Sequence, residues 1–284
     1  QMDAEHVSPS FRTQIENARF CRDRQLAWHP ALGFLAVVDL DGGGIQPVVA
    51  RVGQAIAVGV IRLDNRAELA RRMDCEVRGM GDLELAMRFL LRDSGARVDE
   101  MLGDFAFVVW DPSTRRLMAV RDTFGVRTLY HAGPRNGLMA FCSRAEPLAS
   151  GDQYDVKYLV DRIAYCRSDP ERTVYSGVRA VPPASLLHLR HGAHALTTYW
   201  SATDAQTTSR PLGSTEDQVV EFRSLLIEAV RLRLGDGPHT WSHLSGGLDS
   251  SSVVSVAQWL EHSGSVQHGL GGTVTYTDPL GTGA

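Results

Sequence analysis

The sequence predicts a mixed fold, α/β and α+β, in two domains that differ in their pattern of elements. Through about the first 200 residues, short β-rich runs alternate with Gly, Pro, Asn and Asp. After residue 216 the order changes to helix, strand, glycine loop and helix, which is typical of a parallel-sheet nucleotide-binding domain. With 284 residues, the chain is long enough for two hydrophobic cores.

The first part is expected to form packed sheets. Residues 34–39, 55–63 and 184–189 have the composition of strands. Residues 105–110 and 116–120 flank an Asp-Pro pair and predict a buried hairpin. Apolar residues at helical spacing predict helices over residues 82–93 and 158–165.

A linker is expected over residues 201–215, which hold few large apolar side chains and many turn formers. The predicted domains are therefore residues 1–200 and 216–284. Thr215 is expected to cap a helix over residues 216–234. A strand near 241–244, a helix over 252–260 and a strand-like run at 272–277 follow. The apolar face expected on the first of these helices consists of Val219, Val220, Phe222, Leu225, Leu226, Val230 and Leu234.

Composition excludes several classes of protein. Hydrophobic residues make up 43% and charged residues 22%, and no apolar run approaches the length of a membrane span. The net charge of −4 and the lack of a Lys/Arg block argue against nucleic acid as the main partner. The start of the sequence does not resemble a secretory signal, so a cytoplasmic location is expected. The cysteines, expected to be reduced, are Cys21, Cys75, Cys142 and Cys166.

The chemistry is expected at the run Ser245-Gly-Gly-Leu-Asp-Ser250, which follows a strand and precedes a helix. Backbone amides at a helix N-terminus favour bound phosphate, and glycines let the backbone approach it closely. Asp249 would repel phosphate unless Mg²⁺ bridged the two, so Asp249 is the predicted metal ligand. The residues predicted to bind ATP are Leu244, Ser245, Gly246, Gly247, Leu248, Asp249, Ser250 and Ser251.

The alternative interpretation is a tight turn with a Ser or Asp cap, because a glycine pair between a strand and a helix is common. Six specified residues in a strand–loop–helix setting favour the phosphate site. The lysine of a Walker loop is absent. The run resembles the PP-loop of ATP pyrophosphatases, a resemblance that implies ATP and Mg²⁺ as cofactors and the release of pyrophosphate.

The first part resembles the N-terminal domain of asparagine synthetase B enzymes. The resemblance rests on the order of several runs: Leu35-Ala-Val-Val-Asp-Leu40, Gly103-Asp-Phe-Ala-Phe107, Arg121-Asp-Thr-Phe-Gly-Val-Arg-Thr-Leu-Tyr130 and Gly177-Val-Arg-Ala-Val-Pro-Pro183. It implies an Ntn-type αββα sandwich of the glutamine amidotransferase class, followed by the start of an adenine-nucleotide-binding domain. It also implies that the backbone of residues 272–277 contacts adenine.

The sequence departs from that family at the positions that hydrolyse glutamine. The expected N-terminal cysteine is missing, and Cys21 is internal, so it lacks the free amine that activates such a nucleophile. Phe34 stands where the family has a carboxylate-binding arginine. Val60-Ile61-Arg62 stands where the family has Asn-Gly-Glu, which would remove the oxyanion contacts. A degenerate class II amidotransferase domain is therefore expected.

Without ammonia from glutamine, an amide ligase must take its amine from a substrate. The resemblance then points to ring-closing relatives, lasso peptide cyclases ahead of β-lactam synthetases. It implies macrolactam formation on a precursor peptide, with a leader-peptide-binding protein and a peptidase as further partners. A glutamine-hydrolysing asparagine synthetase and a non-catalytic scaffold stay open. No catalytic residue is assigned: Arg121 and Asp122 are expected to be a structural pair, and the histidines weighed and set aside are His131, His239, His243 and His268.

Overall fold

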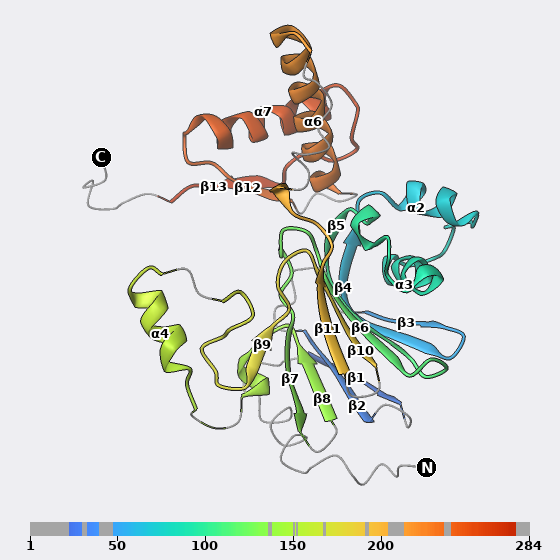
Figure 1. Ribbon diagram of the computed structural model, residues 1–284. Coiled ribbons are helices and arrows are strands. Elements are labelled where there is room, and N and C mark those ends of the chain that lie inside the picture. Colours follow the sequence, from blue (N-terminus) through green and yellow to red (C-terminus); the bar gives the residue numbers. More distant parts are fainter. Residues whose placement is uncertain are drawn as a thin grey trace. The chain divides into compact units, whose positions relative to one another are not determined.

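The computed structural model divides the chain into two compact units, Gln1–Thr207 and Thr208–Ala284. It describes residues 23–29, 33–39, 48–135, 138–149, 151, 153–166, 169–190, 193–203, 213–235 and 240–276, the first two ranges only as strands. Most of the predicted linker lies outside these residues, so its limits stay a prediction. Figure 1 shows the helices and strands of the two units.

A six-stranded antiparallel sheet forms the centre of unit 1. Its strand order is β11-β10-β6-β5-β4-β3. The strands are β3 (Val48–Val52), β4 (Ala55–Leu63), β5 (Gly103–Asp111), β6 (Arg116–Arg121), β10 (Ser185–Arg190) and β11 (Ala193–Thr198). The predicted hairpin is β5–β6, and β4 has the predicted bounds, so both predictions are confirmed.

The two faces of this sheet have different partners. Along β5, Phe105, Phe107 and Val109 are buried in a core that includes α3 (Asp82–Asp93), the helix predicted with the same bounds. Helix α2 (Arg66–Met73) and the 3₁₀ turn η2 (Val98–Glu100) complete this side. The alternate residues Ala106 and Val108 belong to the core on the opposite face. Side chains therefore alternate as the pleat requires.

A second antiparallel sheet packs against that opposite face of the six-stranded sheet. It has the order β8-β7-β9, with β7 (Tyr130–Arg135), β8 (Leu138–Cys142) and β9 (Val178–Ala180). Leu129, Phe141 and Val181 pack against the six-stranded sheet. β1 (Asp23–His29) and β2 (Gly33–Asp39) pair as a separate antiparallel hairpin, which confirms the strand predicted at 34–39.

Two short helical segments accompany the second sheet: η3 (Glu146–Leu148) and α4 (Val156–Ile163). Helix α4 covers most of the helix predicted over 158–165, but it ends earlier, and it buries none of its residues. A helix-covered sandwich of antiparallel sheets confirms the predicted fold class.

Unit 2 contains α6 (Thr215–Leu234), β12 (Trp241–His243), α7 (Leu248–His262) and β13 (Gly272–Val274). β12 and β13 pair in parallel, as predicted. The prediction that Thr215 caps α6 was wrong, because Ser214 is the N-cap. The Ser214 hydroxyl accepts a hydrogen bond from the Asp217 amide, and the Asp217 carboxylate accepts one from the Ser214 amide, which together form a capping box.

The apolar face of α6 is only partly covered. Val230 and Leu234 are buried against α7, whereas Val219 and Phe222 are 61% and 68% exposed. Of the predicted apolar face, the described residues of unit 2 therefore bury only the C-terminal part.

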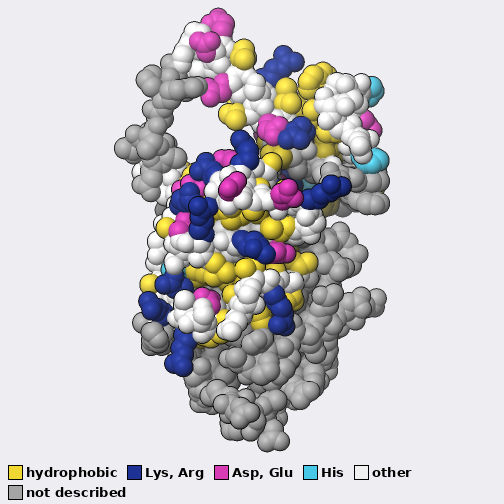
Figure 2. Space-filling view, turned by 90° about the vertical axis from the view of Figure 1, so that its right-hand side faces the viewer, with side chains coloured by type: hydrophobic (Ala, Val, Ile, Leu, Met, Phe, Trp, Pro, Cys, Tyr) yellow, Lys and Arg dark blue, Asp and Glu magenta, His cyan; other side chains and the backbone are white. Residues whose placement is uncertain are grey.

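Charges of both signs are mixed on the face of unit 1 formed by α2 and α3 (Figure 2). Arg88 bonds to Glu84 along α3, and Arg72 bonds to Glu68 along α2, each at 2.8 Å. Such i,i+4 pairs are typical of a solvated helix face. Within the described residues, no helix combines the length and the apolar character needed to cross a membrane.

Candidate nucleotide-binding site

The predicted nucleotide loop lies where the parallel strands β12 and β13 end. The Leu244 amide donates to the Val274 carbonyl at 2.9 Å, and the Thr275 hydroxyl donates to the Leu244 carbonyl at 2.7 Å. These bonds fix the start of the loop against both strands. In parallel sheets, ligands bind outside the carboxyl ends of the strands, which is where this loop lies.

The loop is closed by hydrogen bonds between its two ends. The Ser245 and Ser250 hydroxyls are 3.0 Å apart, and the Ser245 amide donates to the Ser250 hydroxyl at 3.2 Å. Gly246 has a φ of +80°, a conformation that favours glycine. One boundary was predicted wrongly, because α7 begins at Leu248 and not at residue 252. Asp249, Ser250 and Ser251 therefore belong to its first turn.

The N-terminus of α7 has unused donors. Gly247 is the N-cap and has no side chain to accept a bond, while the Ser251 amide bonds to the Gly247 carbonyl at 3.1 Å. The amides of Leu248, Asp249 and Ser250 donate to no acceptor in the described part of the chain. The loop is exposed to solvent. This arrangement suits an anion with several oxygens, such as a polyphosphate.

Asp249 brings the only acidic side chain of this first turn. Its carboxylate is exposed and makes no hydrogen bond or ion pair with a described residue. Among the described residues, no group of three or more His, Cys, Asp or Glu side chains could hold a metal by itself. One carboxylate beside a phosphate site fits Mg²⁺, which is held by one or two carboxylates together with substrate phosphates.

An aromatic pair that the sequence did not suggest joins the last residue of β12 to the segment after β13. The rings of His243 and Tyr276 stack with centroids 5.7 Å apart and an interplanar angle of 16°. Tyr276 is 85% exposed. β13 itself ends at Val274, so the predicted adenine-contacting strand is shorter than residues 272–277, and Thr277 lies outside the described residues.

The other histidines do not form a site among the described residues. His131 is buried, and burial lowers its pKa to about 4. His268 is exposed. His239 lies outside the described residues.

The positions at which the sequence is expected to depart from the glutamine-hydrolysing family can be located in part. Val60, Ile61 and Arg62 lie near the end of β4. The Arg62 guanidinium forms ion pairs with Asp64 and Asp104, each at 3.2 Å. A charged cluster thus stands where the resemblance implies contacts to glutamine. The Phe34 side chain and Cys21 lie outside the described residues.

Arg121 and Asp122 have structural roles, as expected, but each binds backbone groups and no ion pair joins them. Arg121 donates to the carbonyls of Arg127, Val181 and Gly125 at 2.7, 2.8 and 2.9 Å. The Asp122 carboxylate accepts the amides of Val126 and Arg127 at 2.8 and 2.9 Å. Together they fix the turn over residues 122–127.

Comparison with known proteins identifies the family. Residues 22–200 match the family model described as a glutamine amidotransferase domain. The chain belongs to this family. Residues 221–270 match the asparagine synthase model. The succession of the two matched domains supports the predicted asparagine synthetase family.

The curated relatives of this chain include an amidase and an asparagine synthetase. An amidase, chry2 of Gibberella zeae, is 30% identical over 83% of this chain and 36% of its own length. The glutamine-hydrolysing asparagine synthetase 3 of Bacillus subtilis is 28% identical over 78% of this chain and 37% of its own. The chain spans about a third of the length of these relatives. A solved glutamine phosphoribosylpyrophosphate amidotransferase of B. subtilis aligns with a TM-score of 0.37 and 14% identity, over 87% of this chain and 52% of that one.

Proposed function

We propose that the protein is an ATP-dependent amide ligase that releases AMP and pyrophosphate. A substrate carboxylate attacks the α-phosphate of ATP, pyrophosphate leaves, and an amine then displaces AMP from the acyl-adenylate to form the amide. The observation that carries this proposal is the loop at residues 245–250, with unpaired amides at the start of α7 and an exposed Asp249 beside them. The match to asparagine synthase over residues 221–270 supports it.

The loop residues have distinct parts in this proposal. The amides of Leu248, Asp249 and Ser250 bind the β- and γ-phosphates and stabilise the charge that grows on the departing pyrophosphate. Asp249 would hold Mg²⁺, which when bound neutralises phosphate charge. Gly246 and Gly247 keep the approach free of side chains, since space around Gly246 is open to 4 Å. Thr275, bonded to the Leu244 carbonyl, steadies the start of the loop.

The source of the amine is the finer part of the proposal. Arg62 is held by Asp64 and Asp104 at the position where the resemblance implies an amide-binding residue. The neighbouring Val60 and Ile61 offer no polar side chain to a tetrahedral oxyanion. We therefore infer that the amine comes with a substrate. The preferred reaction is macrolactam closure of a precursor peptide, as in lasso peptide cyclases, with a leader-peptide-binding protein and a peptidase as partners.

Two other functions make different predictions. A glutamine-hydrolysing asparagine synthetase would release ammonia from glutamine, and relatives with that name support it. A non-catalytic scaffold would keep the fold without binding nucleotide. Glutaminase assay of the natural full-length protein tests the first, and ATP–pyrophosphate exchange with a candidate precursor peptide tests the second, because a scaffold would show no exchange.

The nucleotide step is testable on this chain by calorimetric titration with ATP, in the presence of Mg²⁺ and in its absence. Asp249→Asn is expected to weaken Mg-ATP binding by about tenfold or more, the value of one charge-assisted contact. Without Mg²⁺ the same change is expected to leave ATP binding equal or tighter, because a carboxylate that repels phosphate has been removed.

The matched control is Glu216→Gln, which removes an exposed acid from the first turn of α6. It should change neither titration. Equal Mg-ATP affinity in the Asp249→Asn variant would refute the assignment of Asp249, and no ATP binding at all would favour the scaffold.

A further inference from the structure

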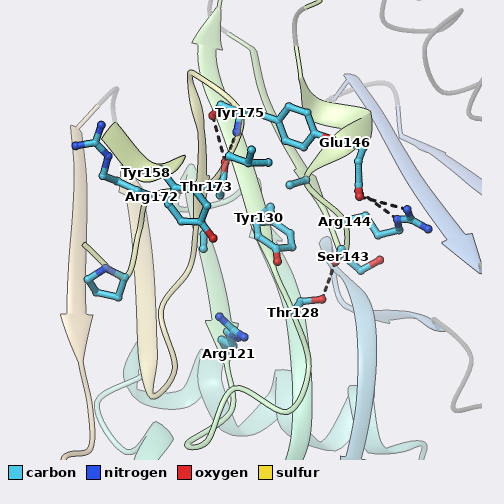
Figure 3. A pocket seen from close by; sticks show the side chains of 14 residues that line it. Arg121, Thr128, Tyr130, Ser143, Arg144, Glu146, Tyr158, Arg172, Thr173 and Tyr175 are labelled. Atoms are coloured by element: carbon cyan, nitrogen blue, oxygen red, sulfur yellow. Dashed lines mark hydrogen bonds and ion pairs between the residues drawn. The ribbon is translucent and has the colours of Figure 1, made fainter. Parts of the chain in front are cut away.

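Unit 1 contains a cavity of about 540 Å³ that the sequence analysis missed. It lies between β7, β9, α4 and the segment at residues 170–175 (Figure 3). Its lining combines aromatic and cationic side chains, chiefly Arg121, Tyr130, Arg144, Tyr158, Arg172 and Tyr175. Pockets of a few hundred cubic ångströms that mix aromatic walls with a few polar groups are typical ligand sites.

Two of the three arginines are neutralised by neighbouring carboxylates. Arg172 forms a bidentate pair with Asp155, with bonds of 2.6 and 2.9 Å. Arg144 forms a pair with Glu146 at 3.2 and 3.3 Å. Arg121 has no such partner: no described carboxylate lies within ion-pair distance of its guanidinium. The Asp122 carboxylate lies close enough to act electrostatically on Arg121, but its oxygens accept backbone amides and form no ion pair with the guanidinium.

Arg121 also keeps hydrogen-bonding capacity. A guanidinium has five N–H groups, and Arg121 donates three of them to the carbonyls of Gly125, Arg127 and Val181. Two N–H groups therefore remain without a partner among the described residues. Because Arg121 is half-buried, its guanidinium loses part of its hydration, and this burial lowers its pKa. Half-buried cations are normally paired with an anion.

Two phenols add further donors beside this guanidinium. The hydroxyls of Tyr130 and Tyr158 make no hydrogen bond with any described residue. Figure 3 shows both directed towards the part of the cavity that holds Arg121. The Arg121 guanidinium and these two hydroxyls thus line the same cavity.

We propose that this cavity binds a carboxylate-bearing ligand of the size of an amino-acid or dipeptide unit, with the carboxylate on Arg121, Tyr130 and Tyr158. A carboxylate has about four acceptor positions, which equals the number of free donors here. Its negative charge would pair with the Arg121 guanidinium, which forms no ion pair with a described carboxylate. A phosphate monoester carries nearly two charges and would leave one unbalanced.

The site goes beyond the proposed ligase reaction, because its residues all belong to unit 1 and none belongs to the nucleotide loop. Val60, Ile61 and Arg62, the positions expected to contact glutamine, do not line it either. The test therefore omits ATP, and its result does not depend on nucleotide binding.

The experiment is calorimetric titration of the whole chain with N-acetyl-glutamyl-leucine amide and with its glutaminyl counterpart. We expect the glutamyl probe to bind at least about tenfold more tightly, since a charged acceptor contributes more than a neutral one. Tyr130→Phe and Tyr158→Phe, which each remove one hydroxyl, should each weaken the glutamyl probe by about fivefold to tenfold and leave the glutaminyl probe unchanged. Arg121 is left intact because its loss would also release three carbonyls.

Tyr276→Phe is the control, since this exposed tyrosine lies in unit 2. Equal affinity for the two probes, or no binding up to about 10 mM probe, would overturn the proposal. So would an equal loss in the control variant. Tighter binding of O-phosphoserine than of the glutamyl probe would overturn the choice of a carboxylate.

Discussion

Substitution of Asp122 should destabilise unit 1 strongly and in graded steps. Asp122 is 1% exposed, and its carboxylate accepts the amides of Val126, Arg127 and Phe105 at 2.8, 2.9 and 3.3 Å. One oxygen serves Val126, and the other serves Arg127 and Phe105. A buried amide that loses its acceptor costs about 1–3 kcal/mol.

The magnitudes follow from this division of the two oxygens. Asp122→Asn can keep the oxygen that serves two amides but turns an NH₂ group towards the Val126 amide, so the expected loss is about 2 kcal/mol. Asp122→Ala removes all three acceptors, two of them at short distance, and should cost about 4 kcal/mol. Since domains are stable by only about 5–15 kcal/mol, the alanine variant should be close to unfolding at elevated temperature.

The assay is urea unfolding at neutral pH, followed by tryptophan fluorescence and circular dichroism. Asp111→Asn is the control, because Asp111 accepts bonds from Ser113 and Thr114 in an exposed turn; a change within about 0.5 kcal/mol is expected there. If Asp122→Asn also fell within that range, or if alanine cost no more than asparagine, the assigned role of the carboxylate would be wrong.

Two further predictions concern pH and the helix beside the cavity. The pKa of His131 is lowered from 6.5 to about 4 by burial, so the unfolded chain binds the proton first, and stability present above about pH 6.5 should fall as the pH drops towards 4. His131→Phe should reduce the loss in urea midpoint between about pH 7.5 and about pH 5; an unchanged loss would contradict the burial of a neutral imidazole. Asp155 caps α4 by accepting the Tyr158 amide at 3.0 Å and also pairs with Arg172, so Asp155→Asn should speed hydrogen exchange across Val156–Ile163. Asp161→Asn, which removes the ion pair with Lys157 on the same helix but leaves the cap in place, should have a smaller effect, and equal exchange in the two variants would argue against the cap.

The elements that the sequence predicted best are those whose local pattern and tertiary burial agree. β4 is a largely apolar run that is mostly buried and is paired on both sides, and the apolar spacing of α3 coincides with its buried face. The start of α7 was missed because Asp249 and Ser250 favour loops and caps, whereas here Gly247 is the cap and these residues are already helical. For α6, spacing identified the apolar face but could not say how much of it the described part of unit 2 covers.

The cavity could not be predicted for a different reason. Arg121, Tyr130, Tyr158 and Arg172 are separated by up to about fifty residues, and no spacing rule joins them. They meet because β7 pairs with β9 and because Arg172 is drawn to the cap of α4 by Asp155. The nucleotide loop, in contrast, is contiguous in sequence, so its position was predictable although the role of each residue stays a prediction.

Two arginines of unit 1, Arg62 and Arg121, are candidates for binding a carboxylate, and their partners distinguish them. In unit 1, Arg62 forms ion pairs with Asp64 and Asp104, so this cation, at a position expected to contact glutamine in the family, is not available to a new carboxylate. Arg121 is the lining arginine that forms no ion pair with a described carboxylate, and it lies at the end of β6. If the domain kept an affinity for carboxylates after losing glutamine chemistry, that affinity should reside at Arg121 and not at Arg62. Arg62→Gln should then leave binding of the glutamyl probe unchanged while Tyr130→Phe weakens it, and the reverse result would return the carboxylate site to β4.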